Sequence, residues 1–168
     1  SYQMKVTGSS TNDRIGDVRP RGVITGNYHD IETSALTIVH RSSITSNTAV
    51  RNAKDVNVMR FEAQASEAKD ILMTDFIFES ANGFSIQNGT NFALWVDSNG
   101  DGNVDTILQS GVASQSNSVT FDELAGGGRV VPKNGTAVFE VHTDIASSLT
   151  GTNPVLQVRF DTGATFVS

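Results

Sequence analysis

The sequence predicts an all-β protein, a two-sheet antiparallel β-sandwich that is Ig-like or jelly-roll-like, with about eight or nine strands after an irregular N-terminal segment. Three observations support this fold class. From Ala35 onward, short apolar stretches alternate with turn clusters. Within several stretches, apolar and polar side chains alternate with the period of a half-buried strand. No window as long as a typical helix shows helical periodicity.

The predicted strands differ in how apolar they are. Residues 71–79 form the most apolar stretch, which is typical of a central strand. In residues 137–143, Phe139 and Val141 alternate with Glu140 and His142, which predicts one buried and one solvent-facing side. The full set of expected strands is 35–41, 56–65, 71–79, 92–96, 106–109, 118–121, 137–143 and 155–160, with 164–167 as one more.

Turn signals separate these stretches. Asn-Gly pairs at Asn82, Asn88 and Asn134 are strong turn formers, because glycine adopts positive φ at little cost. Glycines 126–128 predict a loop. At most a single helical turn is expected, at residues 53–55 or 66–70.

The sequence pattern divides the chain into an N-terminal extension, residues 1–33, and a sandwich domain, residues 34–168. The extension is polar and interrupted, with short apolar pieces such as residues 2–6. It is interpreted either as an exchanged strand or as the end of a preceding domain, and the alternative is that it packs on its own sandwich. The chain starts at Ser1 without a hydrophobic leader, so either a leader was removed or the chain is part of a longer protein.

Charge and composition argue against several function classes. With 12 Lys and Arg against 18 Asp and Glu, the net charge of −6 argues against nucleic acid as a partner. No apolar run is long enough to span a membrane. The absence of cysteine excludes disulfides and thiolate zinc sites. No nucleophile elbow, phosphate-binding glycine loop or identifiable pair of catalytic carboxylates appears, so an enzyme is not predicted.

One group of residues predicts a metal-binding site. Between the strands expected at 92–96 and 106–109, oxygen-bearing residues recur at alternate positions around Gly102, as in a calcium-binding loop. No glutamate closes the loop at its twelfth position, which is Leu108. Calcium fits better than magnesium because the loop offers many flexible protein oxygens. The alternative is a simple hairpin turn. The candidate metal ligands are Asp97, Asn99, Asp101, Asn103 and Asp105.

Other features favour structural roles. The histidines, His29, His40 and His142, lie outside any metal-binding spacing. Asn88 and Asn134 match the glycosylation sequon but also fit turns. Four aromatic residues are more typical of a sandwich core than of a sugar-stacking platform. They are Phe76, Phe78, Phe84 and Trp95.

The order of these motifs resembles the Ig-like β-sandwich modules of bacterial and archaeal cell-surface, S-layer-type proteins. The resemblance rests on VNVMRFEAQA at 56–65, FALWVDSNGDGNVDTIL at 92–108 and VPKNGTAVFEVHTDI at 131–145. It implies a secreted, calcium-stabilised structural module with a DxNxDGxxD calcium loop, and the ligands carry over to the five residues named above.

We therefore expect an extracellular structural module of a surface layer or filament, which binds copies of itself or neighbouring surface domains. The alternative is a carbohydrate-binding or adhesin module, for which a glycan would be the partner. That alternative requires exposed aromatic side chains on a sheet face or loop.

Overall fold

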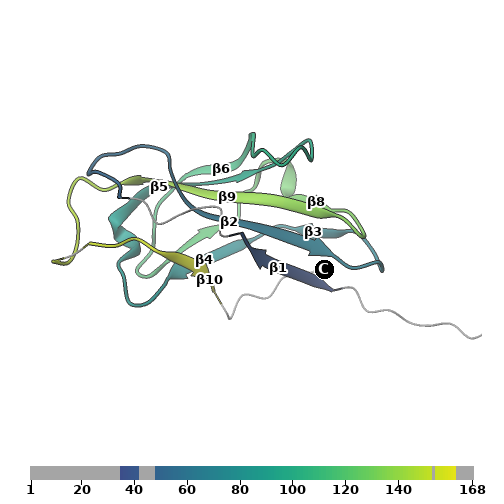
Figure 1. Cartoon of the computed structure of the whole chain (residues 1–168), viewed down its shortest axis with the longest axis horizontal. Helices are drawn as coiled ribbons and strands as arrows, with labels where there is room; N and C mark the ends of the chain where they lie inside the picture. Colours follow the sequence, from purple (N-terminus) through teal and green to yellow (C-terminus); the bar gives the residue numbers. More distant parts are fainter. Residues whose placement is uncertain (1–34, 42–47, 153, 162–168) are drawn as a thin grey trace, which may run out of the picture. The chain divides into compact units, whose positions relative to one another are not determined.

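The computed structural model describes residues 35–41, 48–152 and 154–161, all of which belong to one compact unit spanning residues 32–168 (Figure 1). The predicted extension at 1–33, the predicted domain boundary, His29 and the expected strand at 164–167 lie outside the described residues.

The described part of the chain is all-β, with ten strands, every pairing of which is antiparallel. The predicted all-β, antiparallel fold class is therefore confirmed. The described residues form ten strands where eight or nine were expected, and three hydrogen-bonded sheets where two were expected. No α-helix occurs among the described residues; Ile86–Asn88 and Ala125–Gly127 are short 3₁₀ turns. The strands are β1 Leu36–His40, β2 Val56–Ala65, β3 Ile71–Met73, β4 Phe76–Ser80, β5 Gly89–Val96, β6 Thr106–Val112, β7 Ser118–Phe121, β8 Arg129–Val131, β9 Thr136–Ile145 and β10 Val158–Phe160.

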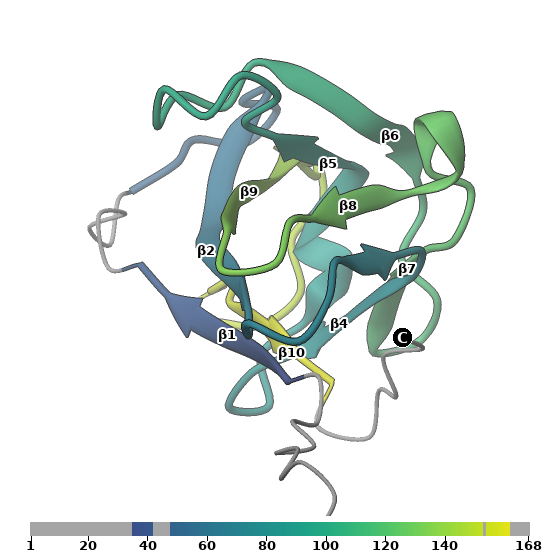
Figure 2. The same ribbon diagram turned by 90° about the vertical axis from the view of Figure 1, so that its right-hand side faces the viewer.

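The strands form three hydrogen-bonded sheets. A five-stranded sheet has the order β1-β2-β9-β5-β6, a three-stranded sheet the order β10-β4-β7, and β3 pairs with β8. In the view of Figure 2, β2 and β9 lie to one side and β4 and β7 to the other. The strongly alternating strands β2 and β9 are central in the largest sheet, where both edges of each strand are hydrogen-bonded.

A phenylalanine cluster fills the space between the large sheet and β4. Phe61 of β2 and Phe139 of β9 stack with their ring centroids 5.1 Å apart. Phe76 and Phe78 of β4 approach Phe61 to 6.1 and 5.9 Å. All four side chains are completely buried. The two layers are thus held together by aromatic burial, as expected for a sandwich.

One predicted strand, 71–79, was wrong as a single element. It is split into β3 and β4, which pair in different sheets. Ile71 and Met73 are buried, and the next buried positions are Phe76 and Phe78. The inward phase therefore shifts by one residue at Thr74–Asp75, which lets the chain leave one strand partner for another. The second half, β4, is central in its sheet as expected.

Smaller differences occur at the ends of the sheets. Strand β10 is confined to Val158–Phe160, and residues 155–157 are not in a strand. Strand β8 was not predicted, because it is short and follows the glycines 126–128. The helical turns expected at 53–55 and 66–70 are wrong, since these residues form only bends and coil.

Candidate metal-binding loop

Residues 97–105 form the connection of the β5–β6 hairpin. Val96 of β5 lies opposite Thr106 of β6. At the base of the loop, the Asp105 amide donates to the Val96 carbonyl over 3.1 Å, and the Asp97 amide donates to the Val138 carbonyl over 2.9 Å. The loop is thus anchored to its own hairpin and to the neighbouring strand β9.

Asp97 organises the interior of this loop. Asp97 is buried, with only 3% of the residue exposed. Its Oδ1 accepts hydrogen bonds from the amides of Asn99 at 3.2 Å and Gly100 at 2.7 Å. Its Oδ2 accepts one from the amide of Gly102 at 2.7 Å. Three backbone donors therefore satisfy one buried carboxylate, which a buried charge requires.

Two further side chains, like Asp97, accept a hydrogen bond from the backbone amide two residues further along the chain. Oδ1 of Asn99 accepts from the Asp101 amide at 2.9 Å, and Oδ1 of Asp101 accepts from the Asn103 amide at 2.7 Å. The Asn99 amide group also donates to Oδ2 of Asp101 at 3.2 Å. These Asx turns follow from the alternation of Asp and Asn in the sequence. They bring Asn99 and Asp101 into direct contact, with Asp97 bonded to the same loop.

Asp105 is held at the base of the loop. Its carboxylate accepts hydrogen bonds from the Ser98 amide at 3.0 Å, the Ser98 hydroxyl at 3.1 Å and the Thr106 hydroxyl at 2.9 Å. These donors, the Ser98 amide first, hold the pKa of Asp105 below its ordinary value. Asp105 therefore staples the two ends of the loop together.

Two glycines permit the tight course of the backbone. Gly100 has φ +78° and Gly102 φ +87°, a region that side chains rarely adopt. An added Cβ would meet no neighbouring atom within 4 Å at either position. The glycines are therefore required for conformation, not for space.

Sequence reasoning missed two arginines that bind the carbonyl groups of this loop. The guanidinium of Arg60 on β2 donates to the Gly102 carbonyl. Arg129 on β8 donates to the carbonyls of Asp97 at 3.2 Å and Ser98 at 3.4 Å. These residues lie 42 and 32 positions from their loop partners, so no local motif could have revealed them.

Arg60 also connects the loop to a polar network on the outer side of the large sheet. It pairs with Glu140 at 2.7 Å, and the other oxygen of Glu140 lies 2.9 Å from Nε2 of His142. Nδ1 of His142 lies 2.7 Å from Asp55. The predicted outward orientation of Glu140 and His142 is thus confirmed, and a continuous chain of contacts runs from residue 55 to the loop.

A second acidic centre lies beside this network. Asp144 accepts from the Asn91 side-chain amide at 2.9 Å, from Lys54 at 2.8 Å and from the Asp55 amide at 3.1 Å. The Asn91 hydrogen bond, followed by Lys54 and the Asp55 amide, lowers the pKa of Asp144 to about 2. This carboxylate joins the 52–55 turn to β5 and β9.

The carboxylates of the loop do not by themselves form a complete set of ligands for a hard cation. Among the described residues, no three side chains of His, Cys, Asp or Glu are placed together to hold a metal ion. A cation in the loop would therefore depend on the mixed oxygens that calcium accepts, namely carboxylate, amide and backbone carbonyl groups with water. Oδ1 of Asp97 and Oδ1 of Asp105 each accept two hydrogen bonds. The oxygens that accept a single one keep a second lone pair for a cation, and they include Oδ2 of Asp97, Oδ1 of Asn99 and both carboxylate oxygens of Asp101.

The remaining candidates have structural positions. Asn88 is buried, and its side chain bonds the Thr150 amide at 2.7 Å and the Val155 carbonyl at 3.2 Å, so this sequon residue serves as an internal brace. Asn134 is exposed. Phe76 and Phe78 belong to the core, which excludes them from a sugar platform. Trp95 is half-buried, with its ring 5.4 Å from that of His142.

In the part of the chain that the structure describes, no helix has the length and apolar character needed to cross a bilayer. No protein-family model matches the chain, and no curated protein is significantly similar to it.

Proposed function

We propose that this chain is an extracellular structural module of a cell-surface layer or filament, and that loop 97–105 binds calcium and thereby stabilises the sandwich. The observation that carries the proposal is the preformed loop, in which Asp97 is buried and bonded to three amides of its own loop. Such preorganisation reduces the entropy lost when an ion orders the loop.

The ion would be held by Asp97, Asn99 and Asp101, whose side chains already share one turn, together with the backbone carbonyl of Asn103 and with Asp105 or water. Calcium would supply positive charge between carboxylates that otherwise repel one another. Arg60 and Arg129 bind loop carbonyls from outside and hold the loop in place. The role is structural, because the loop lies at the end of a hairpin.

An assembly role is supported by the resemblance to S-layer-type modules and by the polar, acidic composition, which suits a secreted protein. The proposed partners are copies of this chain or neighbouring surface domains.

A carbohydrate-binding module is the second candidate, and one observation favours it. Trp95 lies on the outer side of the large sheet directly opposite Ile107, which is 42% exposed. An aromatic residue on an open sheet face can stack on a sugar. Quenching or enhancement of the fluorescence of Trp95, the only tryptophan, during titration with a glycan panel would support this candidate.

The proposed function is tested by electron microscopy of the full chain in millimolar calcium, with a chelated sample as control. Ordered sheets or filaments that disappear on chelation are the expected result. Monodisperse particles under both conditions would contradict an assembly role and would direct attention to the glycan titration.

A further inference from the structure

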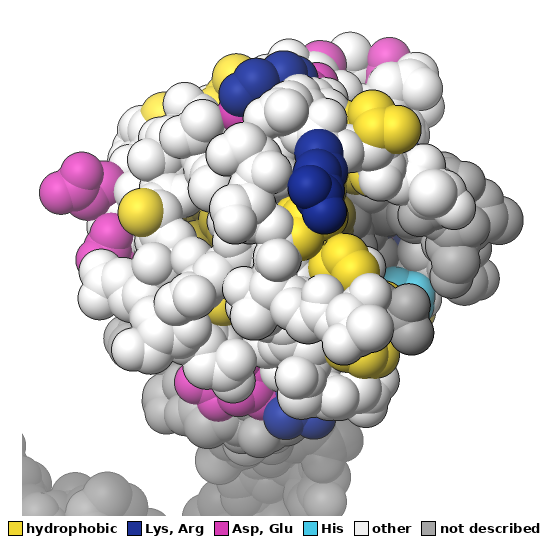
Figure 3. All heavy atoms as spheres, turned by 90° about the vertical axis from the view of Figure 1, so that its left-hand side faces the viewer, with side chains coloured by type: hydrophobic (Ala, Val, Ile, Leu, Met, Phe, Trp, Pro, Cys, Tyr) yellow, Lys and Arg dark blue, Asp and Glu magenta, His cyan; other side chains and the backbone are white. Residues whose placement is uncertain are grey.

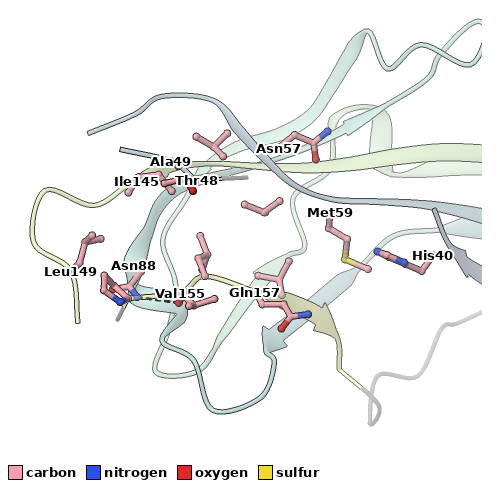
Figure 4. A pocket seen from close by; sticks show the side chains of 15 residues that line it. His40, Thr48, Ala49, Asn57, Met59, Asn88, Ile145, Leu149, Val155 and Gln157 are labelled. Carbon is pink, nitrogen blue, oxygen red and sulfur yellow. Dashed lines mark hydrogen bonds between the residues drawn. The ribbon is translucent and has the colours of Figure 1, made fainter. Parts of the chain in front are cut away.

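A cavity of 620 Å³ opens at the side of the sandwich where β1 and β10 form the edges of their sheets. We call it the edge slot. Figure 4 shows it between the start of β2 and the segment that leads into β10. Figure 3 views this end of the molecule, where hydrophobic side chains reach the surface at several points and most acidic side chains lie nearer the margin. The slot is defined here by His40, Met59, Ile145, Val155, Leu156 and Val158.

The slot marks a place where the core is incompletely covered. The inward positions of β2, from Met59 to Ala65, are all buried. On the neighbouring edge strand β1, the equivalent inward residues Leu36 and Ile38 are only half-buried. Among the described strands, β2 is the only one that pairs with β1. Strand β1 pairs with residues 61–65 of β2, so beyond His40 the edge of β2 at residues 56–59 has no described strand beside it, and this stretch of β2 lines the slot.

The chemistry of the slot suits an extended apolar segment. Ten of its 15 lining residues are apolar, and none of the 15 is Asp, Glu, Lys or Arg. Val155 at its mouth is 42% exposed. Asn88 bonds the Thr150 amide and the Val155 carbonyl, so this wall is braced by a buried side chain. A segment with apolar side chains at alternate positions would bury them here without desolvating a charge.

We propose that the edge slot binds residues 2–6 of a second copy of this chain as an added β-strand along residues 56–59 of β2, beyond the end of β1. In this segment, Tyr2, Met4 and Val6 alternate with Gln3 and Lys5, so one side is apolar and the other polar. The apolar side fits the uncharged slot, and the single charge of the segment, on Lys5, faces away from it.

The 28 residues between Val6 and Ala35 span at most about 90 Å when extended, which is enough to reach a neighbouring molecule. A contact between a terminal segment and a slot elsewhere on the next copy is heterologous, and such contacts build open chains of subunits. This choice of a second copy rests on the proposed assembly function.

Cysteine cross-linking of full-length chains tests the docking, because the natural chain has no cysteine. One set of variants carries a single cysteine at position 2, 3, 4, 5 or 6, and each is mixed in calcium with a Val155→Cys chain under mild oxidation. Interchain disulfide yield is read on non-reducing gels. The matched control partner is Val130→Cys, since Val130 is 46% exposed, comparable to Val155, but does not line the slot.

We expect cross-linking to Val155→Cys at positions 2, 4 and 6 to exceed that at positions 3 and 5 by roughly threefold or more, following the two-residue period of a strand. The Val130→Cys partner should show no such alternation. Equal yields along the segment, or equal yields with both partners, would overturn the docking. A Met4→Cys/Val155→Cys chain diluted in excess wild-type chain that forms only intrachain disulfides would overturn the choice of a second copy.

Sedimentation of the wild-type chain in the same buffer separates this inference from the proposed function. Large calcium-dependent particles without the alternating pattern would refute the edge slot as the contact and leave the assembly role intact. Absence of particles from the wild-type sample would contradict the assembly role itself. As a second readout, Met4→Lys should abolish the particles, whereas Gln3→Lys, with the same added charge on the other side of the segment, should leave them.

Discussion

In loop 97–105, hydrogen bonds from the same chain satisfy the polar groups, whereas at the edge slot apolar side chains stay exposed. In the loop, the buried carboxylate of Asp97 accepts three backbone amides, and Arg60 and Arg129 bind the carbonyls. At the slot, Val155 and Leu156 keep apolar surface in contact with solvent. The hydrogen bonds of the loop stabilise a single molecule, whereas the apolar surface of the slot is the surface that we propose a second copy covers.

The largest loss in the free energy of unfolding is expected from a substitution in the closed core, and a smaller loss from a substitution at the slot. Phe61→Ala removes a fully buried ring that contacts Phe76, Phe78 and Phe139, and is expected to lower the free energy of unfolding by about 3–5 kcal/mol. Leu156→Ala removes a half-buried side chain that lines the slot and is expected to cost about 1–2 kcal/mol. Urea unfolding followed by circular dichroism measures both, and equal losses would show that the slot is as well packed as the core.

The next effect sharpens the account of the loop. Asp97→Asn replaces a carboxylate oxygen by an amide group that faces backbone donors, so we expect a loss of about 1–3 kcal/mol even without calcium. Asp101→Asn at an exposed position should change stability without calcium by less than about 0.5 kcal/mol and should reduce the stabilisation that calcium provides. Thermal melts with calcium and with chelator measure both terms. If calcium raised the melting temperature of Asp101→Asn as much as that of the wild type, Asp101 would not be a ligand.

The smallest expected effect is a decrease in melting temperature at low pH. The pKa of Asp144 is lowered to about 2 and that of Asp105 is lowered, so both carboxylates favour the folded state once ionised. Their contribution is present above the unfolded pKa of about 3.9 and is lost as pH falls through the folded values. Melting temperature should therefore fall between about pH 4 and pH 2. Asp144→Asn should flatten that decline, and an unchanged decline would assign it to other carboxylates.

Much of the fold could be predicted because regular alternation is a local property. Residues 56–65 and 118–121 were predicted with the bounds that the structure has. Residues 71–79 could not be divided from the sequence, because Thr74 and Asp75 interrupt the apolar residues by only two positions. Only the tertiary pairing shows that they separate strands of two sheets. Strand β8 has three residues, too few for any periodic signal.

The loop was similarly predictable in its local part. Alternating Asp and Asn predicted the turns, and the structure places Asn99 and Asp101 in contact. The role of Asp105 as a staple to Ser98 and Thr106 depends on the hairpin closing, and the arginine contacts depend on packing between strands distant in sequence. The edge slot had no local signature, because its lining comes from segments far apart in the sequence, among them residues 56–59 and 154–158.

A calorimetric titration of the full chain with calcium, repeated with Asp97→Asn, tests directly whether loop 97–105 binds calcium. We expect one calcium ion per chain with a dissociation constant on the order of 0.1–1 mM, the range of extracellular calcium modules. Magnesium should bind more weakly, and Asp97→Asn should abolish the heat. No calcium-dependent heat in the wild type, or equal heat in the variant, would contradict a calcium site in loop 97–105.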